Sequence, residues 1–454
     1  MRPIKRIVPH ALVRAASRLV STPVFIPRTK SIAAFLAFTL LATTASALTP
    51  KQRQDNIDSF EYVWTAIRDK HWETKPGGLD WQAIHDEFRP AIEKADSMDA
   101  ARAILSQMLG RLHQTHFGIV PAELYNDVNG SPAKGENTTG IDVRVVGSQA
   151  LVTSVESGSS AAREGVRIGW QIVKIGPADL DPVIAKVNEA QKKSTLRDLI
   201  ARRSVMSRLE GKPGESTQVE FIDEADRHIS KTLVHGQPRG TLTKFGYLYP
   251  EHVWIDSSRV GGGNIGYVSF NIFLDPARLM NLFGEAVQSC MKCDGFVIDL
   301  RGNPGGIGAM AMGMAGWFID QSNQRLGTLY MRDTTLKFVI NPRLNTFSGP
   351  LAILVDASSA STSEILAGGM KDLGRARIFG THTAAAALPS VFEMLPNGDG
   401  FQYAIANYLS EGGKPLEGLG VTPDVETPLT REALLAGKDP ALDAAIAWIK
   451  NKKM

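Results

Sequence analysis

The sequence predicts an α/β protein of several domains, with a helical N-terminal region, a β-rich domain and an α/β core. Three observations predict this order. Apolar residues recur at helical spacing from about 50 to 115, short alternating runs separated by glycines fill 136–237, and strand-like and helix-like runs alternate over 238–432. At 454 residues the chain has room for two or three domains.

The first 47 residues have the pattern of a secretory signal peptide. They carry seven basic residues and no acidic one, and the apolar run Ser31–Ala42 leads to the small residues Ala45-Ser46-Ala47. We expect cleavage after Ala47 and a secreted or periplasmic location. The alternative is an uncleaved membrane anchor, for which an apolar run of about a dozen residues is short.

Charge and cysteine content limit the partners and cofactors that the chain is expected to use. Removal of residues 1–47 takes the formal net charge from +3 to −4, so no basic surface points to nucleic acid. We expect no membrane span after the signal peptide, and no metal or other cofactor. The only cysteines, Cys290 and Cys293, cannot complete a structural zinc site alone, and are read as a local disulfide or two free thiols.

Residues 48–135 are expected to form the N-terminal helical region. The apolar residues at spacings of three and four are Phe60, Val63, Trp64, Ile67, Phe88, Ile92, Ala101, Ile104, Leu105, Met108 and Leu112. Pro76-Gly77-Gly78 interrupts this pattern and predicts a break between helices.

Residues 136–237 are expected to form a β-rich domain. Strand-like runs at 140–146, 150–155 and 171–175 flank the segment Gly158–Gly169, and this order resembles a PDZ domain of the bacterial protease-associated type. The resemblance implies that Gly140, Ile141, Asp142 and Val143 form the loop that binds peptide carboxylates, with the peptide added as an extra strand. The alternative is a plain β-rich insertion.

Residues 238–432 are expected to form the α/β core. Strands are predicted at 264–270, 295–301, 351–356 and 377–380, and helices at 276–290, at 307–320 and after Ser361. The run 295–301 is almost continuously apolar, as expected for a strand that is covered on both faces. Residues 433–454 are predicted to form an amphipathic C-terminal helix.

A serine lies where the apolar run 351–356 gives way to helical spacing. Ser361 therefore stands at a helix N-terminus, where free backbone N–H groups can stabilise an oxyanion. The turn resembles the nucleophile segment of the C-terminal processing (tail-specific) serine peptidases. Those enzymes place a lysine base 25 residues later, and this chain has Ala386 at that position.

Three further segments resemble the same family, and especially its tricorn-type members, which lack the lysine. They are Asp299–Gly306, Arg111–Gly118 and Leu416–Asp424. The resemblance implies a ClpP/crotonase-like peptidase core with Ser361 as nucleophile, His116 as general base, Glu417 as orienting carboxylate and Thr115 in the place of a serine. It also implies that the N–H groups of Gly306 and Thr362 form the oxyanion hole. A base and a carboxylate are needed because a serine hydroxyl alone is a weak nucleophile.

The alternatives for the base are His382, His113 as a further competitor, and no base at all. Lys371 is excluded because it lies ten residues along the same helix, about 15 Å from Ser361. We expect a serine endopeptidase that acts on unfolded proteins or C-terminal tails. One alternative is an inactive relative that binds peptides or small hydrophobic ligands, as interphotoreceptor retinoid-binding protein modules do. The other is a scaffold that uses only the PDZ-like domain.

Overall fold

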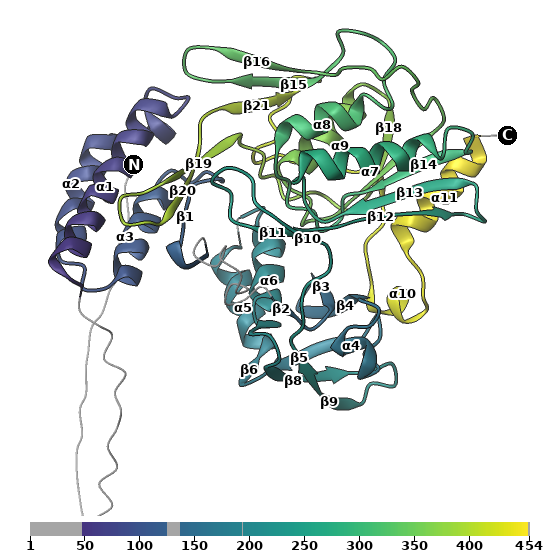
Figure 1. The fold of residues 1–454 in the computed structure, drawn as a ribbon, viewed down its shortest axis with the longest axis horizontal. Helices are drawn as coiled ribbons and strands as arrows, with labels where there is room; N and C mark the ends of the chain where they lie inside the picture. Colours follow the sequence, from purple (N-terminus) through teal and green to yellow (C-terminus); the bar gives the residue numbers. More distant parts are fainter. Residues whose placement is uncertain (1–47, 125–136, 193, 453–454) are drawn as a thin grey trace, which may run out of the picture. The chain divides into compact units, whose positions relative to one another are not determined.

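The computed structural model describes residues 48–124, 137–192 and 194–452 (Figure 1). The predicted signal peptide, residues 1–47, lies outside the described residues. No helix among the described residues has the length and apolar content needed to cross a bilayer.

Three helices open the described chain: α1 (Pro50–Lys70), α2 (Trp81–Glu93) and α3 (Met98–Gly110). The predicted break is present as a short 3₁₀ turn at Pro76–Gly78. The apolar faces of the helices meet in a buried cluster that also takes in Phe401 and Tyr403 from far along the chain. Those two residues belong to β20 (Gly400–Ala404), which pairs antiparallel with β1 (Gly118–Val120) and with β19 (Ser390–Met394).

A β-rich unit, residues 137–236, follows. Its main sheet has the order β3-β4-β5-β8-β9, with β6 paired to β5, and β2 pairs with β7. The strands are β2 (Asn137–Thr138), β3 (Ile141–Val146), β4 (Gln149–Val155), β5 (Gln171–Ile175), β6 (Ala178–Asp179), β7 (Glu210–Gly211), β8 (Ser216–Ile222) and β9 (His228–Val234). The helices are α4 (Ser160–Arg163), α5 (Leu180–Ala190) and α6 (Arg197–Met206). Helix α6 packs beside β3, which is an edge strand of the sheet.

The core is a sheet of order β12-β13-β14-β17-β18-β22, in which only β12 runs antiparallel to its neighbour. The strands are β12 (Ile255–Val260), β13 (Ile265–Phe270), β14 (Gly295–Asp299), β17 (Leu351–Val355), β18 (Ala376–Gly380) and β22 (Val425–Glu426). The helices around this sheet are α7 (Pro276–Gln288), α8 (Gly308–Ala315), α9 (Thr362–Asp372) and α11 (Pro440–Lys452), whereas Leu435 of α10 (Arg431–Leu435) packs against the β-rich unit.

Helices cover both faces of this sheet (Figure 1). Phe296 and Ile298 of β14 pack with α7, α8 and α9, whereas Val297 between them packs with α11. The strand alternates its side chains between two buried layers, which explains its unbroken apolar sequence and confirms the prediction that it is covered on both faces.

The remaining strands form two smaller pairings. β10 (Thr241–Thr243) pairs with β11 (Glu251–Val253), and β15 (Arg325–Tyr330) lies between β16 (Thr335–Val339) and β21 (Asn407–Ser410). Helix α8 ends at Ala315, five residues before its predicted end at 320. Gly316, the next residue, lies so close to Asn341 that an added Cβ atom would stand 2.1 Å from the Asn341 carbonyl oxygen. Cys290 and Cys293 form a disulfide just after α7.

Candidate active site

Ser361 lies in the turn between the fully buried strand β17 and helix α9. Its backbone has φ 53° and ψ −115°, a conformation that costs a non-glycine residue on the order of 1–3 kcal/mol. The Ser361 N–H donates to the carbonyl oxygen of Ala386 at 2.8 Å and to Glu364 Oε2 at 3.0 Å. The surrounding turn therefore holds the serine in a strained conformation at the start of a helix.

The glycine loop after β14 lies directly against this turn. A Cβ atom added to Gly305 would stand 2.7 Å from Ser361 Cβ, and one added to Gly306 would stand 2.3 Å from the Phe273 carbonyl oxygen. The Thr362 hydroxyl donates to the Gly306 carbonyl oxygen at 2.8 Å. The two residues predicted to supply the oxyanion hole, Gly306 and Thr362, are thus brought together beside the serine.

Thr115 joins the predicted base to the predicted carboxylate. Its hydroxyl lies 2.7 Å from His116 Nδ1 and donates to Glu417 Oε2 at 2.9 Å, and its backbone N–H donates to Glu417 Oε1 at 3.0 Å. Because the hydroxyl proton is directed to the carboxylate, the hydroxyl oxygen accepts from Nδ1–H. That tautomer leaves His116 Nε2 free to accept a proton.

The electrostatics of this group favour a neutral imidazole. Burial, with a smaller contribution from the nearby positive charge of Arg203, lowers the pKa of His116 to about 4. Burial raises the pKa of Glu417, and the hydrogen bonds from Thr115 and Ala387 oppose that rise. A neutral histidine near pH 7 is the form that a general base requires.

The segment at the lysine position connects the serine to the histidine side of the site. The Ala386 carbonyl oxygen accepts from Ser361 N–H, and the next residue, Ala387, donates its N–H to Glu417 Oε2 at 3.0 Å. One buried stretch of backbone therefore holds both the nucleophile and the carboxylate. Among the described residues, no hydrogen bond joins the Ser361 hydroxyl to the His116 ring directly.

The competing bases have other surroundings. His382 Nδ1 lies 2.8 Å from the Thr383 carbonyl oxygen and its ring packs against Gly420. His113 is exposed. Lys371 donates to the Thr422 carbonyl oxygen at 2.6 Å and pairs with Asp424 at 2.9 Å. Of the three histidines considered, only His116 contacts a hydroxyl that is itself bonded to a carboxylate.

Glu364 is a site residue that the sequence analysis missed. Its side chain is fully buried, and it accepts hydrogen bonds from the N–H groups of Ser361, Ala385 and Ala386 and from the Thr383 hydroxyl. Burial raises the pKa of Glu364 to about 7, against the effect of those bonds. The sequence does indicate this role for Glu364, because a serine followed three residues later by glutamate is the pattern of a helix capping box.

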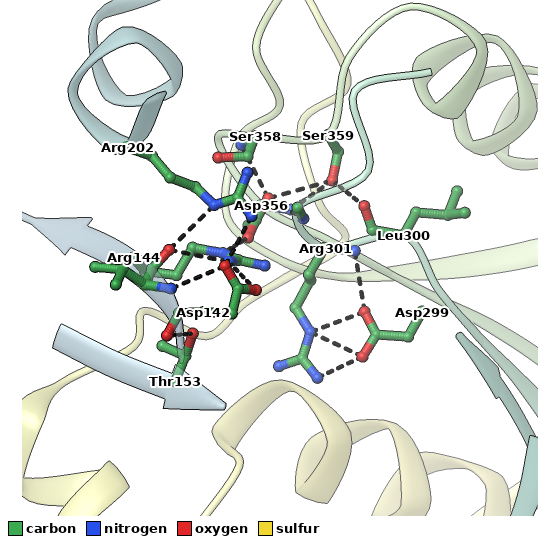
Figure 2. A network of polar contacts seen from close by, with 12 residues as sticks. Asp142, Arg144, Thr153, Arg202, Asp299, Leu300, Arg301, Asp356, Ser358 and Ser359 are labelled. Carbon is green, nitrogen blue, oxygen red and sulfur yellow. Dashed lines mark hydrogen bonds and ion pairs between the residues drawn. The ribbon is translucent and has the colours of Figure 1, made fainter. Parts of the chain in front are cut away.

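The predicted peptide-binding residues connect to the serine turn through a polar network (Figure 2). Arg144, one residue beyond them, pairs with Asp142 at 2.9 Å and with Asp356 at 2.5 Å. Asp356 lies just after β17 and accepts from the N–H groups of Gly302 and Ser358, both at 2.9 Å. Edge strand β3 is therefore tied to the glycine loop and to the serine turn.

The four residues predicted to bind peptide lie at the start of β3. Arg202 of α6 donates to Asp142 Oδ1 at 2.8 Å and to the Val143 carbonyl oxygen at 3.1 Å. Gly140 has φ 86°, and a Cβ there would stand 2.1 Å from Ser159 Cβ. Ile141 is buried in the core of the β-rich unit. No group of three or more potential metal ligands gathers among the described residues.

Comparison with known proteins gives two family matches, peptidase family S41 over residues 264–427 and the tricorn protease C1 domain over residues 53–110. A probable CtpA-like serine protease of Staphylococcus aureus (strain N315) is 26% identical over 349 residues, which cover 74% of this chain and 62% of that protein. Tricorn protease homolog 1 of Streptomyces coelicolor is 24% identical over 413 residues, 86% of this chain and 34% of that protein. The chain thus spans less than two thirds of the length of either relative.

A solved structure shows the same fold. The photosystem II D1 C-terminal processing protease aligns over 88% of this chain and 97% of its own, with a TM-score of 0.54 and 20% sequence identity. The S41 match covers β13 to β22 and α7 to α9, and includes Ser361 and Glu417, and the C1 match covers most of α1 and all of α2 and α3, just before His116. Over residues 264–427 the chain therefore resembles the S41 serine peptidases, and over residues 53–110 it resembles the tricorn protease C1 domain.

Proposed function

We propose that this protein is a serine endopeptidase that hydrolyses peptide bonds of unfolded proteins or C-terminal tails. The observation that carries the proposal is the chain of contacts from Glu417 through the Thr115 hydroxyl to His116. The backbone of Ala386 and Ala387 connects these three residues to the strained serine turn. A hydroxyl, an imidazole and a carboxylate in this order are what nucleophilic catalysis by serine requires.

In the proposed mechanism, Ser361 Oγ attacks the scissile carbonyl carbon while His116 Nε2 takes the hydroxyl proton. The N–H groups of Gly306 and Thr362 stabilise the oxyanion, and His116 then gives the proton to the leaving amine. Water, activated by the same histidine, hydrolyses the acyl-enzyme. Glu417 acts on the imidazole through Thr115, so it stabilises the imidazolium without contacting the ring.

The β-rich unit is proposed to be a PDZ-like domain that presents substrate to this site. Its edge strand β3 and the adjacent helix α6 are the elements between which an added peptide strand would bind, near Gly140–Val143. Removal of the 1–47 segment and a secreted or periplasmic location remain proposals. They rest on the composition of that segment and accord with the Cys290–Cys293 disulfide, since disulfides are common in oxidising compartments and rare in the cytosol.

The test uses residues 48–454 with a reduced, unfolded protein as substrate. Ser361→Ala and His116→Ala are each expected to lower kcat by about 10³-fold or more. His113→Ala, which changes an exposed histidine three residues away, is the matched control and should retain activity. A serine-directed phosphonate should label Ser361 in the wild type.

An absence of both turnover and labelling would exclude the peptidase. Binding of unfolded peptide or of a hydrophobic ligand under those conditions would then support the inactive-relative alternative. If His382→Ala rather than His116→Ala abolished turnover, the serine would stay the nucleophile and the base would be reassigned.

A further inference from the structure

A second histidine, His71, lies fully buried at the point where helix α1 ends. Its backbone N–H donates to the Ile67 carbonyl oxygen at 3.2 Å, and its own carbonyl oxygen accepts from Arg332 Nε at 2.9 Å. Arg332 comes just after β15, within the residues that match peptidase family S41. The backbone of His71 is therefore held both by its own helix and by a residue of the core.

Both ring nitrogens of His71 have partners. Nδ1 accepts a hydrogen bond from the Glu73 N–H at 3.0 Å, so the proton of the neutral ring lies on Nε2. Burial lowers the pKa of His71 and favours this neutral form. Nε2–H donates to the side-chain oxygen of Gln114 at 3.0 Å, and Gln114 directly precedes Thr115. The buried ring thus bonds the residue next to the proposed relay.

The face of the same ring lies against the other end of that segment. The His71 and Phe117 ring centroids are 5.9 Å apart with an interplanar angle of 19°, and Phe117 directly follows His116. Trp72 stacks on the His71 ring as well, at 3.9 Å. His71 therefore contacts the residues on both sides of the Thr115–His116 pair, one by a hydrogen bond and the other by ring stacking.

The backbone of this segment needs such support. His116 has φ 61° and His113 has φ 52°, conformations that residues other than glycine keep only where their surroundings hold them. Glu417 holds Thr115 from the side of the serine turn. His71 holds the neighbouring residues from the side of the N-terminal helices.

We propose that His71 is a positioning residue, which fixes residues 114–117 in the conformation that lets His116 take the proton of Ser361. The inference rests on the proposed function, in which His116 is the base. His71 contacts none of the reacting atoms, so its loss should lower kcat through misplacement of the base and leave KM almost unchanged.

The experiment removes the hydrogen bond from each end. His71→Phe keeps a ring that can stack on Phe117 but has no donor for Gln114, and Gln114→Leu removes the acceptor. Each is expected to lower kcat about 10- to 100-fold with KM within about twofold of the wild type. The rate constant for labelling of Ser361 by the phosphonate should fall by the same factor. The double variant should have the kcat of the single variants, because both remove one bond.

His85→Phe is the matched control, since it changes another histidine of the N-terminal helices, whose side chain is 17% exposed. The His85 ring contacts Phe60 and Trp64 of α1, and Nε2 pairs with Glu61 at 3.2 Å. Its kcat should equal that of the wild type. Circular dichroism at the assay temperature establishes that each variant is folded. If His71→Phe does not fold, Gln114→Leu carries the test, because Gln114 is only half-buried.

Three results would overturn the role of His71 while leaving the peptidase in place. They are a wild-type kcat in Gln114→Leu, a raised KM at unchanged kcat, and losses in kcat that multiply in the double variant, which would show that the two residues act independently. A wild type that cleaves no unfolded protein and resists the phosphonate would instead remove the proposed function itself, and this inference with it.

Discussion

Thr115 has a larger role in this site than its position beside a histidine indicates. The Glu417 carboxylate contacts the Thr115 hydroxyl and backbone N–H, and only that hydroxyl reaches His116 Nδ1. In a serine, histidine and aspartate triad the carboxylate bonds the imidazole directly. Here the carboxylate can fix the tautomer of the histidine only if a hydroxyl stands between them, which explains why a hydroxyl-bearing residue occupies position 115.

Replacement of Thr115 tests whether its hydroxyl is needed between Glu417 and His116. Thr115→Val keeps the shape but removes the donor to Glu417 and the acceptor for Nδ1–H, so we expect kcat to fall about 10- to 100-fold, which corresponds to the loss of a hydrogen bond to a charged group. Thr115→Ser should retain most activity. Steady-state kinetics on one peptide would measure kcat for both variants. Equal kcat values for Thr115→Val and Thr115→Ser would show that the hydroxyl does not connect Glu417 to His116.

Glu364 gives a second prediction, on the pH dependence of stability. Its folded-state pKa of about 7 lies above the ordinary value of 4.5, so the folded protein holds this proton more tightly than the unfolded chain does. The resulting stabilisation is present below about pH 4.5 and is lost as the pH rises through about 7. The full change is about 3 kcal/mol.

Urea denaturation from pH 4 to pH 8 would measure this effect. The free energy of unfolding of the wild type, minus that of Glu364→Gln, should decrease as the pH rises, because glutamine does not titrate. Parallel pH profiles for the two proteins would show that Glu364 has an ordinary pKa in the folded state.

The residues of the site differ in how far the sequence could predict them. Ser361, His116 and Glu417 were predicted because each lies in a segment that resembles a family motif, and the structure places the latter two on either side of Thr115. Glu364 was missed although its spacing from Ser361 is a capping pattern. The contact of Ala387 with Glu417 had no local signal, because it joins residues 30 positions apart in the sequence.

At the scale of elements, strand β3 and the loop after β17 are joined by a partly buried cluster of charges (Figure 2). Arg144 pairs with Asp142 on its own strand and with Asp356 beside the serine turn, and its side chain is 16% exposed. Its guanidinium also lies against Gly302, where a Cβ would stand 2.3 Å from Arg144 Nη2. The cluster therefore fixes the β-rich unit to the loops that hold the nucleophile.

Arg144→Met is expected to destabilise the protein by about 3–5 kcal/mol, because it leaves the Asp356 carboxylate without its cation. The double variant Arg144→Met with Asp356→Asn should recover part of that loss. Urea denaturation of the two variants would measure the difference, with Arg197→Met as a control for loss of an exposed arginine. A single variant as stable as the wild type would show that the pair contributes nothing to folding.

The sequence predicted those helices and strands whose pattern of apolar residues lies within the element itself. The strands and helices of the core follow from apolar runs and helical spacing, and the structure has them at β13, α7, β14, β17, α9 and β18. The pairing of β1 with β20 was not predicted, because it joins Gly118 to Gln402 and no local pattern reports on a partner so distant. The small sheet β16-β15-β21 was missed for the same reason, since β21 comes from another part of the chain.

At the scale of the whole described molecule, the site combines residues that precede the β-rich unit in the sequence with residues that follow it. His116 and Thr115 lie just before β1, whereas Ser361 and Glu417 belong to the S41 region. The β1–β20 pairing and the contacts of α1 to α3 with the β19–β20 hairpin attach the first group to the second. Catalysis should therefore depend on the docking of the N-terminal helices, although they contribute no side chain to the reaction.

One buried ion pair contributes to that docking beside the apolar cluster. Arg102 of α3 donates to both carboxylate oxygens of Asp399, whose side chain is fully buried and also accepts the Ala122 N–H at 2.8 Å. Arg102→Met would leave this carboxylate buried without its cation, at a cost of about 3–5 kcal/mol. This cost destabilises the packing of the N-terminal helices, which precede His116, and affects the sheet that carries Ser361 only indirectly.

We therefore expect Arg102→Met to lose peptidase activity at a lower urea concentration than the core sheet unfolds. Hydrogen exchange followed by mass spectrometry should show α1 to α3 opening in that range, while β14 and β17, buried between two helical layers, stay protected. Arg53→Met is the matched control, because Arg53 bonds only the Ala95 carbonyl oxygen within the N-terminal helical layer. Simultaneous loss of activity and of protection in β14 and β17 would show instead that the molecule unfolds as one cooperative unit, in which the N-terminal layer cannot separate from the peptidase core.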